Sequence, residues 1–229
     1  MAYRQTQRVT RKLAARREAI LAAALNTLAE NGLAALQIAP VAERAGIAAG
    51  TVYRYFPTKA ELLAAVVAGL ADAEVAALAR AGAAAPGPLS ALAAALATFA
   101  MRTLARRRLV LALTAEAAEP ELIPALASFR RALAAAIEKL IGNALASGHL
   151  QQQDAPLAAP ALIGALIEGL IGPLAPPAMA EETEMHAQAQ RLTVLALRAL
   201  GVGDARARGL VAQTPMQVYP EEATAGSPR

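Results

Sequence analysis

Four side chains that suit contacts with nucleic acid lie within a single run of five residues, namely Thr51, Tyr53, Arg54 and Tyr55. The guanidinium of Arg54 has the planar fork that pairs with guanine, and Thr51 can touch a thymine methyl group or donate a hydrogen bond. Tyrosine hydroxyls, and the ammonium of the nearby Lys59, suit phosphate oxygens, which fix register but carry no sequence information. For Arg54, base recognition and a plain phosphate contact are equal alternatives.

The residues around this run predict two short helices joined by a tight turn. Before the turn, Val41 and Ala45 give the first helix an apolar face. Gly46 supplies left-handed backbone angles that glycine alone adopts without strain. After the turn, Val52 and Phe56 lie four residues apart on the inner face of the second helix, so that the donors face outward. This pattern is typical of a helix-turn-helix whose second helix enters a major groove.

A third helix follows at once. Pro57 ends the second helix, and Thr58 with Glu61 fits the capping box that opens a helix at Lys59. We expect this helix to run to about Arg80.

At these positions the chain resembles the TetR-type (TetR/AcrR) family of transcriptional regulators. The residues that carry the resemblance are Ala45-Gly46, Gly50-Thr51-Val52-Tyr53-Arg54-Tyr55-Phe56, Lys59, Leu62 and, further back, Arg16 to Leu21 and Asn31-Gly32. Beyond the first quarter of the chain the resemblance is one of architecture only. It implies an all-α fold of about nine helices, with an N-terminal helix-turn-helix domain and a larger C-terminal helical domain for ligand binding and dimerisation.

The resemblance also implies a set of DNA-contacting residues: Gln37, Ala49, Gly50, Thr51, Tyr53, Arg54, Tyr55 and Lys59. Gly50 would let the backbone approach the DNA strand closely. The chain departs from the family at the start of the preceding helix, where members usually carry Ser or Thr near Gln37 and often a basic residue near Ala39. This departure removes a helix cap and a cation that would otherwise serve phosphate contacts.

Positive charge is concentrated at the end of the chain that carries this motif. Residues 1–60 hold nine Lys or Arg and three acids, whereas the remainder holds 13 and 15. A net charge of +6 on the first segment and −2 on the rest therefore places positive potential where phosphate binding requires it. A basic segment alone is also compatible with a solvated tail.

The composition favours helices and gives little support to catalysis. Hydrophobic residues make up 56% of the chain but aromatic residues only 3%, so alanine and leucine carry the apolar content. There is no cysteine, and neither histidine (His149, His186) has the spacing of a metal ligand. No nucleophile elbow, Walker loop or dinucleotide fingerprint occurs. We therefore expect no enzyme activity, no cofactor, no metal and no membrane association, and a cytoplasmic location.

We expect three regions. Residues 1-58 form a basic arm and the helix-turn-helix domain, with the first helix beginning at Thr10. Residues 59-200 form the helical effector-binding and dimerisation domain. Residues 201-229, rich in Gly, Pro and charge, form a flexible tail with at most a helical turn between 205 and 211.

Two helices near the end of the second region are apolar on almost every side, which predicts a dimer contact. A helix of that kind must be covered on both faces, and two such pairs across a two-fold axis make a four-helix contact. The alternative is burial within one subunit. The predicted interface residues are Ile163, Gly164, Ile167, Ile171, Leu192, Leu195 and Ala199. Gly164 and Gly172 would permit close approach.

The resemblance further implies a small-molecule effector enclosed between helices of the C-terminal domain. Candidate lining residues are Phe99, Leu104, Leu111, Leu113, Phe129 and Leu133. Such residues can equally be plain core. The three adjacent arginines 106–108 read as a solvated corner or, alternatively, as a site for an acidic ligand.

The resemblance thus implies a homodimeric repressor that binds a palindromic double-stranded operator and is released by an apolar or amphipathic effector. Two recognition helices would then sit about 34–36 Å apart to meet successive major grooves. One alternative is a small-molecule-binding protein or enzyme with a vestigial DNA-binding end. Another is an architectural DNA-binding protein without an effector. Specific binding of the protein to the DNA upstream of its own gene, if Tyr53→Ala abolishes it, would favour the repressor.

Overall fold

The computed structural model describes residues 2–115, 120–176 and 181–215, and these form an all-helical protein. The described residues make ten α-helices and one 3-10 helix. Their bounds are α1 Ala2–Asn31, α2 Ile38–Arg44, α3 Ala49–Tyr55, α4 Lys59–Ala83, α5 Pro88–Ala105, α6 Arg107–Ala115, η1 Pro120–Leu122, α7 Ile123–Ala146, α8 Ala155–Ile171, α9 Glu182–Ala199 and α10 Asp204–Ala212.

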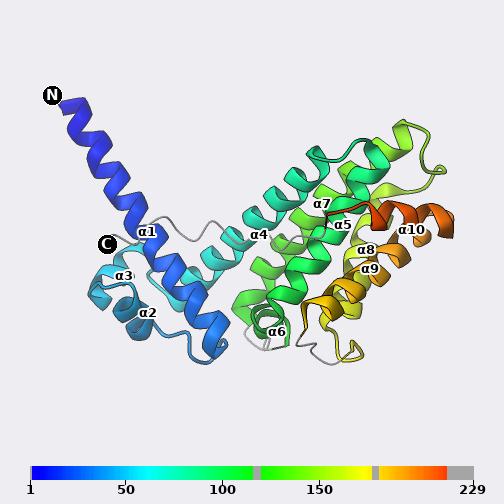
Figure 1. Cartoon of the computed structure of the whole chain (residues 1–229). Helices are drawn as coiled ribbons and strands as arrows, with labels where there is room; N and C mark the ends of the chain where they lie inside the picture. Colours follow the sequence, from blue (N-terminus) through cyan, green and yellow to red (C-terminus); the bar gives the residue numbers. More distant parts are fainter. Residues whose placement is uncertain (1, 116–119, 177–180, 216–229) are drawn as a thin grey trace.

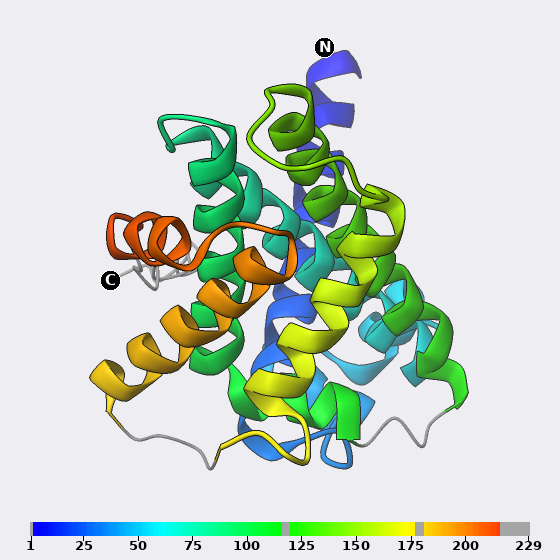
Figure 2. The same cartoon turned by 90° about the vertical axis from the view of Figure 1, so that its right-hand side faces the viewer.

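The helices fall into two groups joined by α4. Helices α1, α2 and α3 form one end of the molecule, and α4 runs from this end into the larger body made by α5 to α10 (Figure 1). Turned by a quarter, the molecule shows α8 and α9 side by side on the face away from the helix-turn-helix, with α10 crossing the end of α9 (Figure 2). The long α4 is therefore the main link between the two groups.

The helix-turn-helix forms as the sequence predicts. Gly46 has φ +66, and its N–H donates to the carbonyl of Glu43, so the chain reverses tightly between α2 and α3. Val52 and Phe56 of the α3 segment are buried with Ile20 of α1 in an N-terminal core. Burial of these side chains fixes which face of α3 stays outside.

Side chains cap the starts of two helices, and the first of these caps is the one that the sequence predicts. Thr58 Oγ1 accepts a hydrogen bond of 3.1 Å from the backbone N–H of Glu61 at the start of α4. Asp154 Oδ1 accepts one of 3.0 Å from Leu157 N–H at the start of α8. Each cap satisfies a backbone donor that the first helical turn leaves without a partner.

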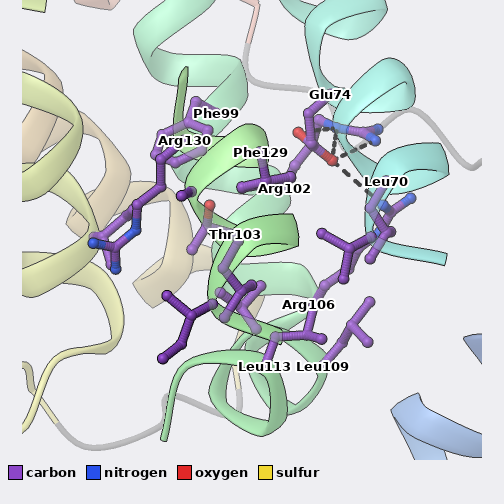
Figure 3. Close-up of a pocket in the computed structure, with 16 residues that line it drawn as sticks. Leu70, Glu74, Phe99, Arg102, Thr103, Arg106, Leu109, Leu113, Phe129 and Arg130 are labelled. Carbon is purple, nitrogen blue, oxygen red and sulfur yellow. Dashed lines mark hydrogen bonds and ion pairs between the residues drawn. The ribbon is translucent and has the colours of Figure 1, made fainter. Parts of the chain in front are cut away.

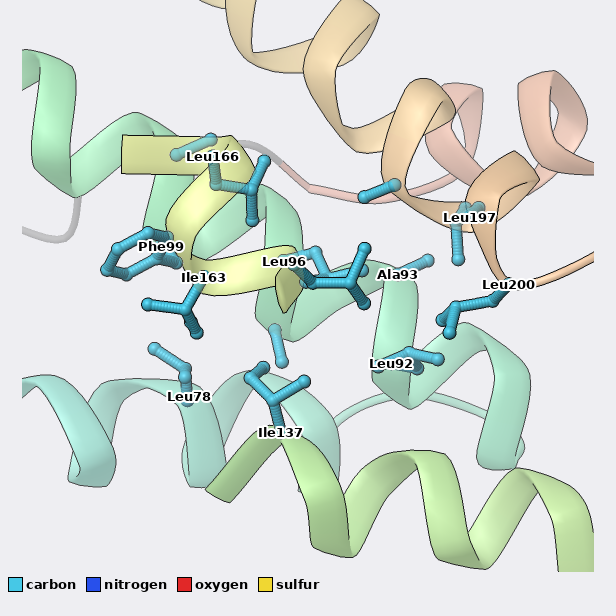
Figure 4. Packing of buried hydrophobic residues seen from close by; sticks show 14 of the residues in the cluster. Leu78, Leu92, Ala93, Leu96, Phe99, Ile137, Ile163, Leu166, Leu197 and Leu200 are labelled. Atoms are coloured by element: carbon cyan, nitrogen blue, oxygen red, sulfur yellow. The ribbon is translucent and has the colours of Figure 1, made fainter. Parts of the chain in front are cut away.

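Helix α5 is the centre of the larger body. Nearly every residue from Leu89 to Leu104 is buried, including a run of alanines, because α4, α7, α8 and α9 all pack around it. Figure 4 shows Leu92, Leu96 and Phe99 of α5 facing side chains that come from several of these helices. Alanine is suited to this place because its small side chain lets neighbouring helices approach closely.

The two ends of the chain differ from the prediction. Helix α1 begins at Ala2 instead of Thr10, so the N-terminal arm is helical through the residues that the structure describes. The predicted tail from residue 201 is wrong for its first part, because Val202, Ala207 and Val211 are buried and α10 packs on α9 and α5. The rest of the predicted tail, residues 216–229, lies outside the described residues.

Helices α4 and α5 are long and apolar enough to cross a membrane by length and composition. Half of the apolar window in α4 and 83% of that in α5 are buried inside the protein. Core helices have the same composition, and burial accounts for the apolar character of these two.

The side-chain cap at the start of α4, the helix that links the two groups, can be tested by mutation. We expect Thr58→Ala to lower the free energy of unfolding by about 1 kcal/mol, because the N–H of Glu61 loses its acceptor. Urea denaturation followed by circular dichroism measures this change. Thr58→Ser, which keeps the hydroxyl, should stay close to the parent protein; an equal loss in both variants would contradict the capping role.

Candidate nucleic-acid interface and internal cavity

Helix α3 presents hydrogen-bonding side chains outward over a buried apolar base. Tyr53 is 52% exposed and Arg54 is exposed, whereas Val52 between Thr51 and Tyr53 is fully buried. Thr51 and Tyr55 are half-buried, and Tyr55 packs against the N-terminal core. The structure thus brings Thr51, Tyr53 and Arg54 to one surface, with Tyr55 at its edge.

The remaining residues expected to contact DNA lie beside α3. Gly50 is exposed, and a Cβ added there would meet nothing within 4 Å. Ala49 at the start of α3 and Lys59 at the start of α4 are half-buried. Gln37 is exposed at the start of α2, where its side chain makes no cap and donates instead to the carbonyl of Ala34 at 3.4 Å. The cap that the sequence lacks at this position is therefore absent from α2.

Two contacts from α1 hold the helix-turn-helix in place. The guanidinium carbon of Arg17 lies 5.3 Å from the ring centre of Phe56, within the range of a cation–π interaction. Arg44 at the end of α2 forms an ion pair with Glu30 near the end of α1, at 2.5 Å. Both pairs fix the orientation of α2 and α3 on the long α1.

An internal cavity of about 330 Å³ lies between α4, α5, α6, α7 and α8. Figure 3 shows side chains from these helices pointing into it. Its walls are mainly apolar, and the charged residues found among the described part of the lining are Glu74, Arg102, Arg106 and Arg130. A cavity of this size and composition suits a small ligand with an apolar body.

A buried ion pair forms part of the cavity wall. Arg102 donates to Glu74 through Nη2 at 2.8 Å and through Nε at 3.0 Å to both carboxylate oxygens. Arg106 Nη1 reaches Glu74 Oε1 at 3.4 Å (Figure 3). Glu74 is on α4 and both arginines are on the α5 segment and its end, so the cluster ties α4 to α5. Among described residues, no buried side-chain donor or acceptor is left without a partner.

Three of the six candidate lining residues face the cavity, and three do not. Phe99, Leu113 and Phe129 line it. Leu104, Leu111 and Leu133 lie outside its wall: Leu133 and Leu104 are buried in the helical core, and Leu111 packs against that core. Alternate sides of the same helices face the cavity and the core, so an apolar residue type alone does not separate the two.

The sequence did contain a signal for the charged residues that were missed. Glu74 falls four residues after Leu70 and four before Leu78, on the apolar stripe of α4. Arg102 falls three residues after Phe99 on α5. A charge on a buried stripe requires a partner, and the two charges have opposite sign. Arg106, read as part of a solvated corner or an acidic-ligand site, has its side chain 20% exposed in the cavity wall.

Some of the residues predicted for the dimer interface are exposed, and others are buried within their own subunit. Gly164, Leu195 and Ala199 are exposed, and Leu195 is 57% exposed. Ile167 and Leu192 are half-buried, and Ile167 also lines the cavity. Ile163 and Ile171 are buried in their own subunit, so they are not available to a partner in this structure.

A different glycine from those predicted allows α8 and α9 to approach. A Cβ at Gly169 would come within 2.8 Å of Leu192 Cδ2, whereas one at Gly164 would meet nothing within 4 Å. At Gly172 the nearest atoms are those of the Glu168 carboxylate. Close packing inside the subunit therefore depends on Gly169, and Gly164 stands on the open face of α8.

Comparison with known proteins identifies the N-terminal unit. Residues 20–66 match the model described as bacterial regulatory proteins, tetR family. The transcriptional repressor KstR of Rhodococcus jostii is 49% identical over 53 residues, which are 23% of this chain and 25% of KstR. KstR of Mycolicibacterium smegmatis is 52% identical over 48 residues, 21% and 24% of the two chains. The match spans about a quarter of the length of these curated relatives.

Solved structures share the whole fold. The crystal structure of RolR with resorcinol has 24% identity and a TM-score of 0.66, covering 90% of this chain and 98% of that one. FadR of Bacillus subtilis with stearoyl-CoA has 20% identity and a TM-score of 0.61, covering 80% and 95%. At these identities the likeness establishes the fold, an N-terminal helix-turn-helix domain followed by a larger helical domain. Within the described residues no group of three His, Cys, Asp or Glu could hold a metal ion.

The buried pair predicts an asymmetric response to mutation. Arg102→Met should lower the free energy of unfolding by about 3–5 kcal/mol, because it leaves the buried Glu74 without its main partner. The double variant Glu74→Leu with Arg102→Met should recover most of this loss, because both charges are gone. Thermal and urea unfolding of the two variants measure the difference, and an equal loss in both would contradict the pairing.

Proposed function

We propose that this chain is a sequence-specific DNA-binding repressor released by a small effector, because its residues 20–66 match the model of the tetR family of bacterial regulatory proteins. The observation that carries the proposal is the surface of α3. Tyr53 and Arg54 stand outward, and the adjacent Gly50 leaves open space for a DNA strand. The protein would work in the cytoplasm on double-stranded DNA, with no catalytic step.

The chemistry of each side chain indicates whether it would contact a phosphate or a base. Tyr53, Tyr55 and Lys59 would hold phosphates and set the register of α3 in the groove. Thr51 and Arg54 would face the base edges, where a guanidinium can pair with guanine. The basic residues of α1 that the structure shows as exposed, such as Arg11 and Arg16, add positive potential at the same end.

The internal cavity supports release by an effector. It lies between α4, which leads to the helix-turn-helix, and the helices of the larger body. Two proteins of similar fold have crystal structures with resorcinol and with stearoyl-CoA. An architectural DNA-binding protein without an effector would be expected to have a filled interior, so the cavity favours the effector-responsive function.

The exposed faces of α8 and α9 would form a homodimer. Leu195 and Leu157 are large apolar side chains exposed on these two helices, and Gly164 leaves room on α8 for a partner helix. A two-fold contact of this kind buries apolar surface and sets the distance between two α3 helices on a palindromic operator.

The roles of Arg54 and Lys59 can be separated by their dependence on sequence and salt. Lys59→Ala should weaken binding to all duplexes alike and reduce the salt slope by about 0.9, the contribution of one phosphate contact. Arg54→Ala should change the preferred sequence. Fluorescence anisotropy measures both effects. The duplexes are the DNA upstream of the gene that encodes this chain and randomised sequences, each at several salt concentrations. An unchanged affinity and slope for Lys59→Ala would contradict its phosphate role.

The dimer contact predicts a change of oligomeric state. Leu195→Glu should convert the protein from dimer to monomer, because it places two charges in an apolar two-fold contact. Light scattering after size-exclusion chromatography measures the mass. Leu13→Glu is the matched control, since Leu13 is 48% exposed on α1, away from α8 and α9. A dimer that survives Leu195→Glu would place the contact elsewhere.

A further inference from the structure

We propose that the ligand of the internal cavity is a mainly apolar molecule with one oxygen atom that accepts a hydrogen bond from the hydroxyl of Thr103. The inference rests on the proposed function, because it names the chemical class of the effector. It is carried by the burial of Thr103 in the cavity wall and by the lack of a partner for its hydroxyl among the residues that the structure describes.

Thr103 is a buried residue of the cavity wall. It lies on α5, is 6% exposed, and lines the cavity together with Phe99, which precedes it by one helical turn. In Figure 3 its hydroxyl points into the space between the surrounding side chains. The hydroxyl is therefore placed to meet a molecule that enters the cavity.

Other buried threonines bond their hydroxyls within their own helix. Thr27 of α1 donates to the carbonyl of Ala23 at 2.9 Å, and Thr193 of α9 donates to that of Ala189 at 2.7 Å. Across the part of the chain that the structure describes, the Thr103 hydroxyl makes no hydrogen bond. No donor or acceptor sealed inside this part lacks a partner, so the Thr103 hydroxyl is open to the cavity that it lines.

An open hydroxyl beside apolar surface favours one kind of ligand. The described part of the wall around it is mainly apolar, with Leu70, Phe129 and Ile167 among its residues. An unpaired hydroxyl in such surroundings costs free energy, which an oxygen of the ligand recovers. A threonine hydroxyl can donate to a neutral oxygen, so the ligand needs no charge.

The neighbouring ion pair holds Thr103 in position. Arg102, the preceding residue, forms three hydrogen bonds of 2.8–3.0 Å with Glu74 of α4. The two side chains are 6% and 10% exposed, so this pair is committed inside the protein. It fixes the turn of α5 that carries Thr103, and a ligand bound to the hydroxyl leaves the pair in place.

The aromatic residues of the chain indicate a suitable apolar body for a test ligand. Two of its three phenylalanines, Phe99 and Phe129, line the cavity. Aromatic rings pack favourably in edge-to-face or offset arrangements. Probes with a phenyl ring therefore match the wall.

The test compares ligands of the same shape that differ at a single group. The pairs are acetophenone against α-methylstyrene and propiophenone against 2-phenyl-1-butene, in which a methylene group replaces the carbonyl oxygen. Calorimetry measures binding to the full chain, and each pair gives a ratio of ketone affinity to alkene affinity. We expect Thr103→Val to lower this ratio about three- to tenfold, as the loss of one neutral hydrogen bond implies. The comparison between proteins cancels the difference in hydration of the two ligands.

Two further variants control the result. Thr103→Ser keeps the hydroxyl and should keep the ratio of the parent protein. Thr98→Val is the matched control, because Thr98 is on the same helix, is also 6% exposed and does not line the cavity. Its hydroxyl likewise makes no hydrogen bond to any described residue, so Thr98→Val should leave the ratio unchanged.

Two other measurements accompany the binding data. Thermal unfolding verifies that each variant is folded. Infrared spectroscopy of bound acetophenone reports the bond itself, because a hydrogen bond lowers the stretching frequency of the carbonyl. This frequency should rise in Thr103→Val and stay unchanged in Thr98→Val.

The outcomes separate the inference from the proposed function. An unchanged ratio in Thr103→Val, an equal fall in Thr98→Val, or failure of both ketones to bind the parent protein would overturn the inference. A fall confined to Thr103→Val upholds it. Release from the DNA upstream of the gene is measured separately by anisotropy. Ketones that bind through Thr103 without weakening DNA binding would count against the proposed release alone.

Discussion

The burial of α5 on every side is the constraint on which the larger body depends. Its alanines allow α4, α7, α8 and α9 to pack closely around one axis, and its longer side chains fill the remaining space. The same burial forces the charge of Arg102 to find a partner inside the protein, and Glu74 of α4 supplies it at 2.8 Å. The pairing is directional, so it fixes how α4 lies against α5 in a way that alanine packing alone would not.

The helix-turn-helix could be predicted because its determinants are local. Gly46 with its positive φ, Pro57 and the Thr58 cap each act within a few residues of the turn or helix end that they define. The start of α1 was placed too late because Thr10 can cap a helix, yet no Gly or Pro precedes it to stop the helix from beginning at Ala2. A competent cap does not by itself begin a helix where the preceding residues are also good helix formers.

The interior could not be predicted to the same extent, because it depends on which faces meet. Phe99 and Leu104 both belong to the core of the larger body, yet only Phe99 also lines the cavity, although both are large and apolar. Ile163 and Ile171 of α8 were expected at a dimer contact, but their own subunit covers them, while Leu195 of α9 stays exposed. The apolar content of a helix shows that its faces must be buried. Whether its own subunit or a partner subunit buries a given face depends on the arrangement of the neighbouring helices.

Charge was the more informative sequence feature in this interior. A glutamate on the apolar stripe of α4 and an arginine on that of α5 can be explained only by a pair or by a ligand, and the structure shows the pair. From the sequence, Arg106 is expected only in a solvated corner or an acidic-ligand site, and Glu74 and Arg102 are missed because the candidate lining residues are chosen for their apolar side chains.

The cavity shares residues with the N-terminal core that supports the helix-turn-helix, which gives a physical basis for coupling between them. Leu109 and Leu113 of α6, and Val67 and Leu70 of α4, line the cavity and also belong to the N-terminal core that holds Val52 and Phe56. A molecule that occupies the cavity therefore touches side chains on which α1 and α3 rest. It can shift the position of α3 only to the extent that it binds one arrangement of these side chains more tightly than the other. Because the shared residues come from α4 and α6 alike, a molecule in the cavity can act on both helices at once.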